Sequence, residues 1–193
     1  MEYKAFEDGI EVNGTTIMSI VDGMGVFRSP AERILKAVGL GDIVADDLHW
    51  YSQQSWLDAF NQIAEKIGEE TLRSIGRKVP ENAVFPPHID NAEAALAAID
   101  VAYHMNHRNS KGEILFNPTR TPPMLEGIGH YQYEARGNGE AKLLCENPYP
   151  CAFDQGIISA MAKRFAVVVD IEHLGGECRS RGAAACAYRV KWS

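Results

Sequence analysis

All four cysteines of this 193-residue chain lie after residue 144, and their placement constrains the C-terminal part more than any other feature. Cys151 stands before a helical pattern, Cys178 lies in the connection between two strand patterns, and Cys186 begins the last strand. Thiolates and imidazole are the usual ligands of structural zinc, and His173 is the best-placed imidazole. We therefore predict a zinc ion held by Cys151, His173, Cys178 and Cys186, which would tie a helix to two strands.

Two alternatives to this ligand set stay open. Cysteine is among the most buried residue types, so the cysteines can instead be ordinary core residues, with His173 a strand-end histidine. Glu172 and Glu177 compete with His173 for the fourth position. Cys145 is left out, because strand alternation places it on the same face as Leu143, as in a packed core.

Helical patterns occupy the first half of the chain. A serine N-cap followed by proline predicts a helix from residue 30 to about Gly39. A second helix is predicted from 53 to about 75, with Gly68 as a candidate break, and a third from 91 to about 107. The second pattern rests on apolar residues at helical spacing, namely Trp56, Phe60, Ile63 and Ile67. An Asn13-Gly14 pair between apolar residues predicts a hairpin over residues 11–21.

Strand patterns dominate the second half. A hairpin is predicted around Gly137–Gly139, then a helix over 154–165, then two strands over 166–173 and 186–192. Helices followed by an antiparallel sheet indicate an α+β fold. We expect a single domain over residues 1–193, with a helical part to about residue 110 and a zinc-containing sheet part over about 111–193.

Composition excludes several classes of protein. The formal net charge is −7, with 26 acidic against 19 basic residues, so we expect no binding to nucleic acid. No signal sequence and no apolar run long enough to span a bilayer is present, so we expect a cytoplasmic protein without a membrane partner. There is no nucleophile elbow, P-loop or GxGxxG motif, and four protein ligands would close a zinc site. We therefore expect no catalytic residues.

Candidate ligand-binding residues are three histidines and a tyrosine. His104 and His107 end the third predicted helix, and His130 and Tyr131 begin the hairpin. A histidine that opens into an apolar cavity can bond a phenol or carbonyl, or ligate haem iron. The alternative is structural, because a helix C-terminus favours a histidine through its dipole alone.

The C-terminal residues resemble a known family. PCAFDQGIISAMAKRF and VVVDIEHLGGECRSRGAAACAYRVKW are similar to the end of 4-vinyl reductase small-molecule-binding domains, which include zinc-containing phenol sensors. The resemblance implies zinc at Cys151, Cys178 and Cys186, with His173 in place of that family's acidic ligand. It also implies a fold related to haem–nitric-oxide-binding domains and Golgi tethering subunits, a ligand cavity, and a homodimer.

These observations together favour a zinc-stabilised, non-catalytic sensor or carrier of a hydrophobic or aromatic ligand, which signals through a partner protein. A haem-based gas sensor that uses His104 or His107 is the first alternative, with haem ranked behind zinc as the cofactor. An enzyme or assembly factor of tetrapyrrole metabolism and a scaffolding module are the others.

Overall fold

The computed structural model describes residues 3–81, 83, 85–175 and 178–193. Helices dominate its first half and strands its second, which confirms the α+β prediction. The first half contains β1 (Glu11–Asn13), α1 (Gly14–Gly23), η1 (Gly25–Phe27), α2 (Arg28–Ala37), β2 (Trp50–Ser52), α3 (Gln53–Lys66), α4 (Glu69–Glu81) and α5 (Ala92–Ala97). The second contains α6 (Ile99–Met105), β3 (His107–Arg108), β4 (His130–Gly137), β5 (Glu140–Glu146), α7 (Cys151–Lys163), β6 (Val169–Leu174), η2 (Arg179–Arg181) and β7 (Cys186–Trp192).

Two antiparallel sheets order these strands. The four-stranded sheet has the order β4-β5-β7-β6, and a three-stranded sheet joins β2, β1 and β3. The predicted hairpin forms β4 and β5, with the non-glycine residue Asn138 in the left-handed conformation at its turn. Cys145 lies opposite Cys186 in the register of β5 and β7. The larger sheet thereby brings the start of the last strand beside the core.

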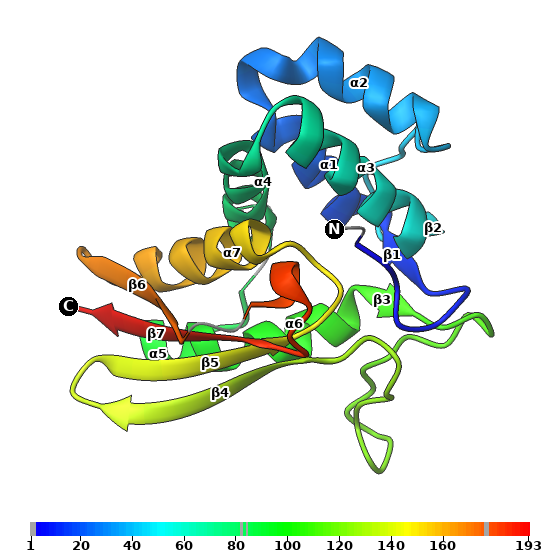
Figure 1. The fold of residues 1–193 in the computed structure, drawn as a ribbon. Coiled ribbons are helices and arrows are strands. Elements are labelled where there is room, and N and C mark those ends of the chain that lie inside the picture. Colours follow the sequence, from blue (N-terminus) through cyan, green and yellow to red (C-terminus); the bar gives the residue numbers. More distant parts are fainter. Residues whose placement is uncertain (1–2, 82, 84, 176–177) are drawn as a thin grey trace.

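Helix α7 lies between the larger sheet and the helices α1–α4 (Figure 1). Its contact with α4 is close because glycines face one another there. A Cβ atom on Gly76 would lie 2.2 Å from the carbonyl oxygen of Phe153, and one on Gly156 would lie 2.2 Å from that of Arg73. The two backbones therefore meet at a distance that no larger residue permits.

The structure corrects several element predictions. The hairpin over 11–21 is wrong, because Asn13 instead caps α1 by accepting a hydrogen bond from the Thr16 amide at 2.8 Å. The helix predicted from 91 to 107 is two helices, α5 and α6, and His107 already belongs to strand β3. Val167 is 94% exposed and precedes β6, so it does not share that strand's inner face.

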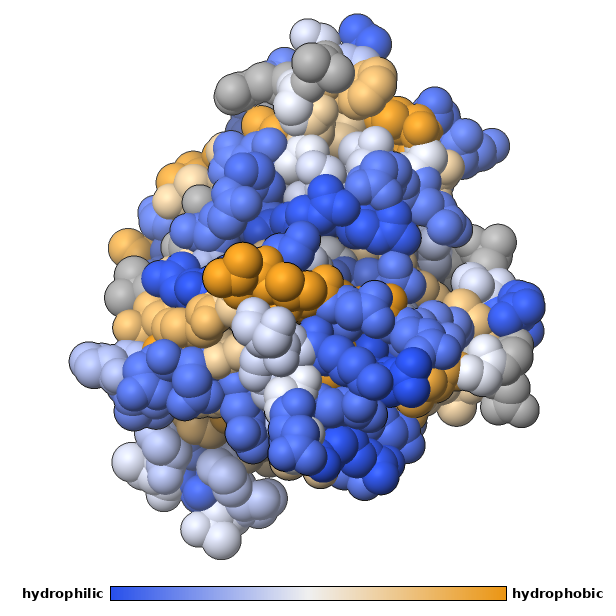
Figure 2. All heavy atoms as spheres, turned by 90° about the vertical axis from the view of Figure 1, so that its left-hand side faces the viewer, coloured by the Kyte–Doolittle hydropathy of each residue, from blue (hydrophilic) through white to orange (hydrophobic). Residues whose placement is uncertain are grey.

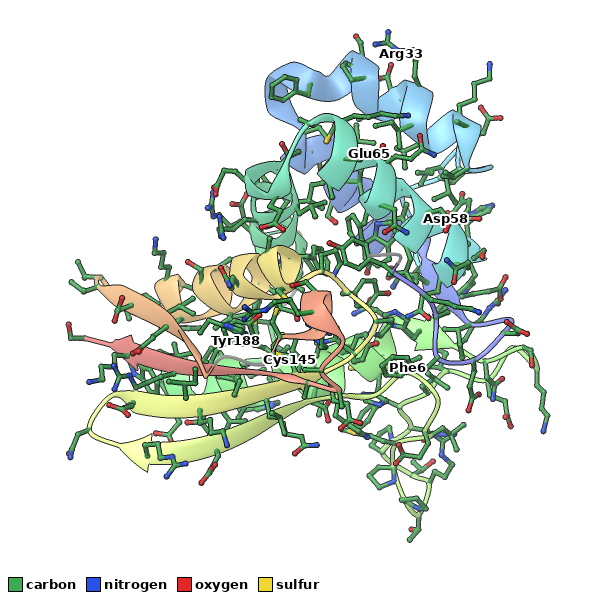
Figure 3. The ribbon with its side chains drawn as sticks, viewed as in Figure 1. Phe6, Arg33, Asp58, Glu65, Cys145 and Tyr188 are labelled. Carbon is green, nitrogen blue, oxygen red and sulfur yellow. The ribbon has the colours of Figure 1, made fainter. Side chains whose placement is uncertain are left out.

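The core is continuous from the helices through α7 to the sheet. Figure 3 shows Tyr188 and Cys145 in the layer between the sheet and α7. Both are fully buried, as is Leu143, which confirms the prediction that Cys145 is a packed core residue. On the inner face of β7, Cys186 and Val190 are also fully buried, as the period of two predicts.

The face of the molecule drawn in Figure 2 is mostly polar, with an apolar patch near its middle. Phe165, Val167 and Val168 are exposed apolar residues in the connection from α7 to β6. Among the described residues, no helix combines the length and the apolar character that a membrane span requires.

The α4–α7 contact gives a stability prediction. Gly76→Ala is expected to lower the free energy of unfolding by about 1–3 kcal/mol, because the new methyl group must push two helix backbones apart. Urea unfolding measures this. Gly41→Ala is the control, since its Cβ would meet only the Lys36 side chain and backbone at 3.4 Å or more. Equal effects of the two substitutions would contradict the tight crossing.

Candidate functional site

His104 is the histidine that the fold buries most completely. It lies on α6 with no exposed surface, and its Nδ1 is 2.8 Å from the backbone oxygen of Asp100, one turn earlier. A carbonyl only accepts, so Nδ1 carries a proton, and in the neutral form of the ring the lone pair is then on Nε2. Nε2 is buried and has no hydrogen-bond partner among the described residues. Such an atom can accept a hydrogen bond or coordinate a ligand without giving up an existing contact.

His130 lies against His104 but is held by carboxylates. The two rings stack with their centroids 4.9 Å apart. Nδ1 of His130 is 2.9 Å from Asp100 and Nε2 is 3.2 Å from Glu126. Burial lowers the pKa of His130, but the two carboxylates outweigh burial and raise it. Both ring nitrogens face carboxylate oxygens, which accept, so this environment favours the imidazolium form of His130.

Asp100, His104 and His130 also come close enough to suggest a metal site. One potential ligand atom of each lies within 4.8 Å of the others. However, both nitrogens of His130 already donate to carboxylates, and stacked rings do not aim two lone pairs at one ion. The group is better described as an ion pair of Asp100 and His130 beside the ring of His104.

His107 is buried too, yet both its nitrogens are occupied. Nδ1 donates to the backbone oxygen of Tyr103 at 2.7 Å, and Nε2 accepts from the Tyr149 hydroxyl at 2.7 Å. Gln53 donates to the same hydroxyl at 3.1 Å. Burial lowers the pKa of His107 to about 3, so the ring is neutral. His107 is a satisfied core histidine rather than an open ligand.

Aromatic rings surround these histidines. Tyr103 contacts Tyr131 and Tyr149 at centroid distances of 5.2 and 5.9 Å, and Trp56 contacts Tyr149 at 5.1 Å. Two surface grooves lie elsewhere, one beside α7 and α4 and one between α2 and α3, and none of the predicted ligand-binding residues lines either. Of those residues, His104, His107 and Tyr131 are buried around Tyr103, and His130, 24% exposed, stacks on His104.

A buried ion pair connects this interior to the cysteines. Asp154, at the start of α7, pairs with the Arg179 guanidinium and accepts a hydrogen bond from the Tyr131 hydroxyl at 2.6 Å. Burial raises the pKa of Asp154 to about 6, against the lowering effect of Arg179. The pair is therefore ionised at neutral pH. Asn147 also bonds to Arg179.

Three of the four predicted metal ligands converge. The sulfur of Cys151 is 3.2 Å from those of Cys178 and Cys186, and all three lie within 4.8 Å of one another. The pKa of Cys186 is lowered because the Cys151 thiol and the Arg179 amide donate to it, and the pKa of Cys151 is raised by the same contact.

The fourth predicted metal ligand is His173. His173 lies against Tyr188, at a centroid distance of 5.0 Å, and helps to lower the pKa of Cys186. Its rival Glu172 pairs instead with Arg189 at the surface, and Glu177 lies outside the described residues. That metal binds at Cys151, His173, Cys178 and Cys186 stays a prediction.

Sequence reasoning missed Asp100, Asp154 and Arg179. A signal for two of them was present, since Asp100 is one helical turn before His104 and Asp154 lies in the first turn after Cys151. Arg179 lies in a turn, yet its side chain is only 9% exposed. Its partner is distant in the sequence, so no local pattern could identify it.

Comparison with known proteins was made at three levels. Neither the family models nor the curated proteins contain a match. Solved structures do match: an H-NOX protein from S. oneidensis in the Fe(II)NO state has a TM-score of 0.64 at 13% identity, covering 94% of this chain and 99% of that one. An oxygen-binding H-NOX domain related to soluble guanylate cyclases has a TM-score of 0.60 at 18% identity, covering 93% and 92%.

A third match comes from work on haem distortion in the H-NOX family, with a TM-score of 0.63 at 17% identity over 94% and 95% of the two chains. The chain has the H-NOX fold. This confirms the predicted relation to haem–nitric-oxide-binding domains. At these identities the H-NOX likeness carries no residue roles, and the resemblance to 4-vinyl reductase domains stays a prediction.

The H-NOX fold overturns one prediction. Zinc as the cofactor, with haem ranked behind it, is wrong, because the structures that share this fold are described by their haem and its iron ligation state. Zinc was ranked ahead of haem because the cysteines are clustered in the sequence.

The Asp154–Arg179 pair yields a stability prediction. Asp154→Asn is expected to cost about 3–5 kcal/mol of unfolding free energy, because Arg179 is left buried without its anion. Chemical denaturation measures this. Glu172→Gln, which breaks an exposed ion pair between β6 and β7, serves as the control and should cost less than about 1 kcal/mol. A small effect of Asp154→Asn would show that Arg179 finds another partner.

His130 gives a pH prediction. Because its folded pKa is raised above the ordinary 6.5, the stability that it contributes is complete below that value and is lost as pH rises through the folded pKa. Urea unfolding of wild type and His130→Gln at about pH 6 and about pH 9 tests this. The advantage of wild type should shrink at the higher pH. A constant advantage would mean that His130 stabilises the fold by packing alone.

Proposed function

We propose that this chain is a haem-based gas-sensing domain in which His104 ligates the iron. The H-NOX fold supports haem as the cofactor. The observation that carries the proposal is the buried, unpartnered Nε2 of His104. A neutral imidazole with one nitrogen held by a backbone oxygen presents the other as a fixed ligand.

The other two histidines near His104 fit this role less well. His107 would have to give up its bond to Tyr149, and His130 is an imidazolium without a free lone pair. Of the two residues named for the haem alternative, His104 is therefore the one whose environment fits.

Haem, when bound, would supply the iron to which a diatomic gas binds. The chain's own residues hold and shield that ligand. Asp100 fixes the His104 ring through its backbone oxygen, and Tyr103 packs against the same ring with centroids 5.4 Å apart. Aromatic side chains of this kind exclude water from a cofactor site.

The aromatic rings around His104 touch one another in this structure, so haem uptake must separate some of them. Trp56 reports on this, because it lies in the same aromatic cluster. Its fluorescence is expected to fall as haem binds, whereas haem held on the outer surface should leave the near-ultraviolet circular dichroism unchanged.

Haem titration of the purified chain tests the proposal. A Soret band with one-to-one stoichiometry is expected, and His104→Gly should lose it and regain it on addition of imidazole, which replaces the missing ligand. His49→Ala, at an exposed histidine, should keep the band. No band in the wild type, or an unchanged band in His104→Gly, would refute the role of His104.

A second candidate function is direct binding of a small aromatic or polar ligand without haem. Trp56 Nε1 and Gln53 Oε1 are buried, lie one turn apart on α3, and have no hydrogen-bond partner among the described residues. A donor and an acceptor among aromatic rings suit a phenol or an amide. Calorimetric titration of the haem-free chain with phenols tests this, with Trp56→Phe expected to weaken binding. Binding that Trp56→Phe leaves unchanged would argue against this candidate.

A further inference from the structure

The carboxylate of Asp100 lies beside His104, the proposed iron ligand. The proposed function uses only the backbone oxygen of Asp100. Its Oδ1 is 3.6 Å from Nδ1 of His104, the nitrogen that carries the proton. The side chain is 18% exposed, so water screens its charge only in part. A negative charge beside the Nδ1 proton makes Nε2 of His104 a stronger electron-pair donor.

Strand β4 holds that carboxylate in place from the other side. The Tyr131 amide donates to Oδ1 at 2.8 Å, and Nδ1 of His130 donates to Oδ2 at 2.9 Å. Two consecutive residues of one strand therefore fix both carboxylate oxygens. Asp100 cannot turn away from His104 without leaving two donors unpaired, which is costly in a buried setting.

Asp100 thus contacts His104 twice. Its backbone oxygen sets the proton on Nδ1, and its carboxylate stands next to that proton. Acidic groups beside a metal-bound imidazole orient the ring and raise its basicity, and their loss typically weakens metal binding about 10–100-fold.

We propose that Asp100 is the positioning residue of His104, fixing the orientation of the ring and strengthening Nε2 as a ligand of haem iron. This inference rests on the proposed function and names a determinant of the same site. It does not make Asp100 a catalytic residue, because Asp100 acts through His104.

A merely structural role for Asp100 is the rival explanation, since it also ties α6 to β4. Asp100→Asn separates the two roles. The amide oxygen can still accept from Tyr131, so the tie between helix and strand is largely kept, whereas the negative charge is removed.

The haem-loaded chain provides the first measurement. Asp100→Asn is expected to weaken haem affinity about 10–100-fold, to make the reduction potential more positive, and to lower the iron–histidine stretching frequency. Glu126→Gln is the matched control: it removes a carboxylate that bonds to His130, 83% exposed and outside the contacts of His104. The control should leave all three values close to wild type.

The haem-free chain provides a second measurement, which keeps this inference separate from the proposed function. In wild type, nuclear magnetic resonance should show His104 protonated at Nδ1, with a downfield proton signal that moves upfield in Asp100→Asn and not in Glu126→Gln. If haem does not bind, the proposed function fails and this measurement still decides the place of Asp100. An unchanged His104 signal, or an unchanged potential in a variant that binds haem, overturns the inference.

Discussion

The buried pair of Asp154 and Arg179 is the interaction on which the rest of the interior depends. Asp154 lies in the first turn of α7, the helix between the larger sheet and the other helices. Arg179 lies in the connection between β6 and β7, next to Cys178. A buried charge needs its partner and further hydrogen bonds to offset desolvation. Tyr131 and Asn147 supply those bonds, so one ion pair fixes the helix, the cysteine turn and the start of β4 together.

The position of His104 follows from the same arrangement. Tyr131 is anchored at its hydroxyl by Asp154 and at its amide by Asp100. Asp100 in turn holds the imidazole of His104. A chain of buried contacts therefore runs from the α7 N-terminus to the candidate ligand, and each link is a group that would be costly to leave unpaired.

How much the sequence predicts depends on the range of the interactions. The hairpin of β4 and β5, the inner face of β7 and the burial of Cys145 follow from local periodicity. The convergence of Cys151, Cys178 and Cys186 follows from where the elements begin and end. Asn13-Gly14 was misread as a turn, because the same asparagine is also a good helix N-cap, and only the partners of residues 11–13 in β2 and β3 decide between the two.

The role of each histidine illustrates what local patterns cannot decide. His104, His107 and His130 looked equivalent in the sequence, yet one has a free nitrogen, one has both nitrogens satisfied, and one is charged. These differences come from Tyr149, Asp100 and Glu126. Tyr149 is 42 residues from His107, and Asp100 is 30 residues from His130. Selecting a ligand thus needs the contacts of every nitrogen, because residue type and burial alone leave His104 and His107 indistinguishable.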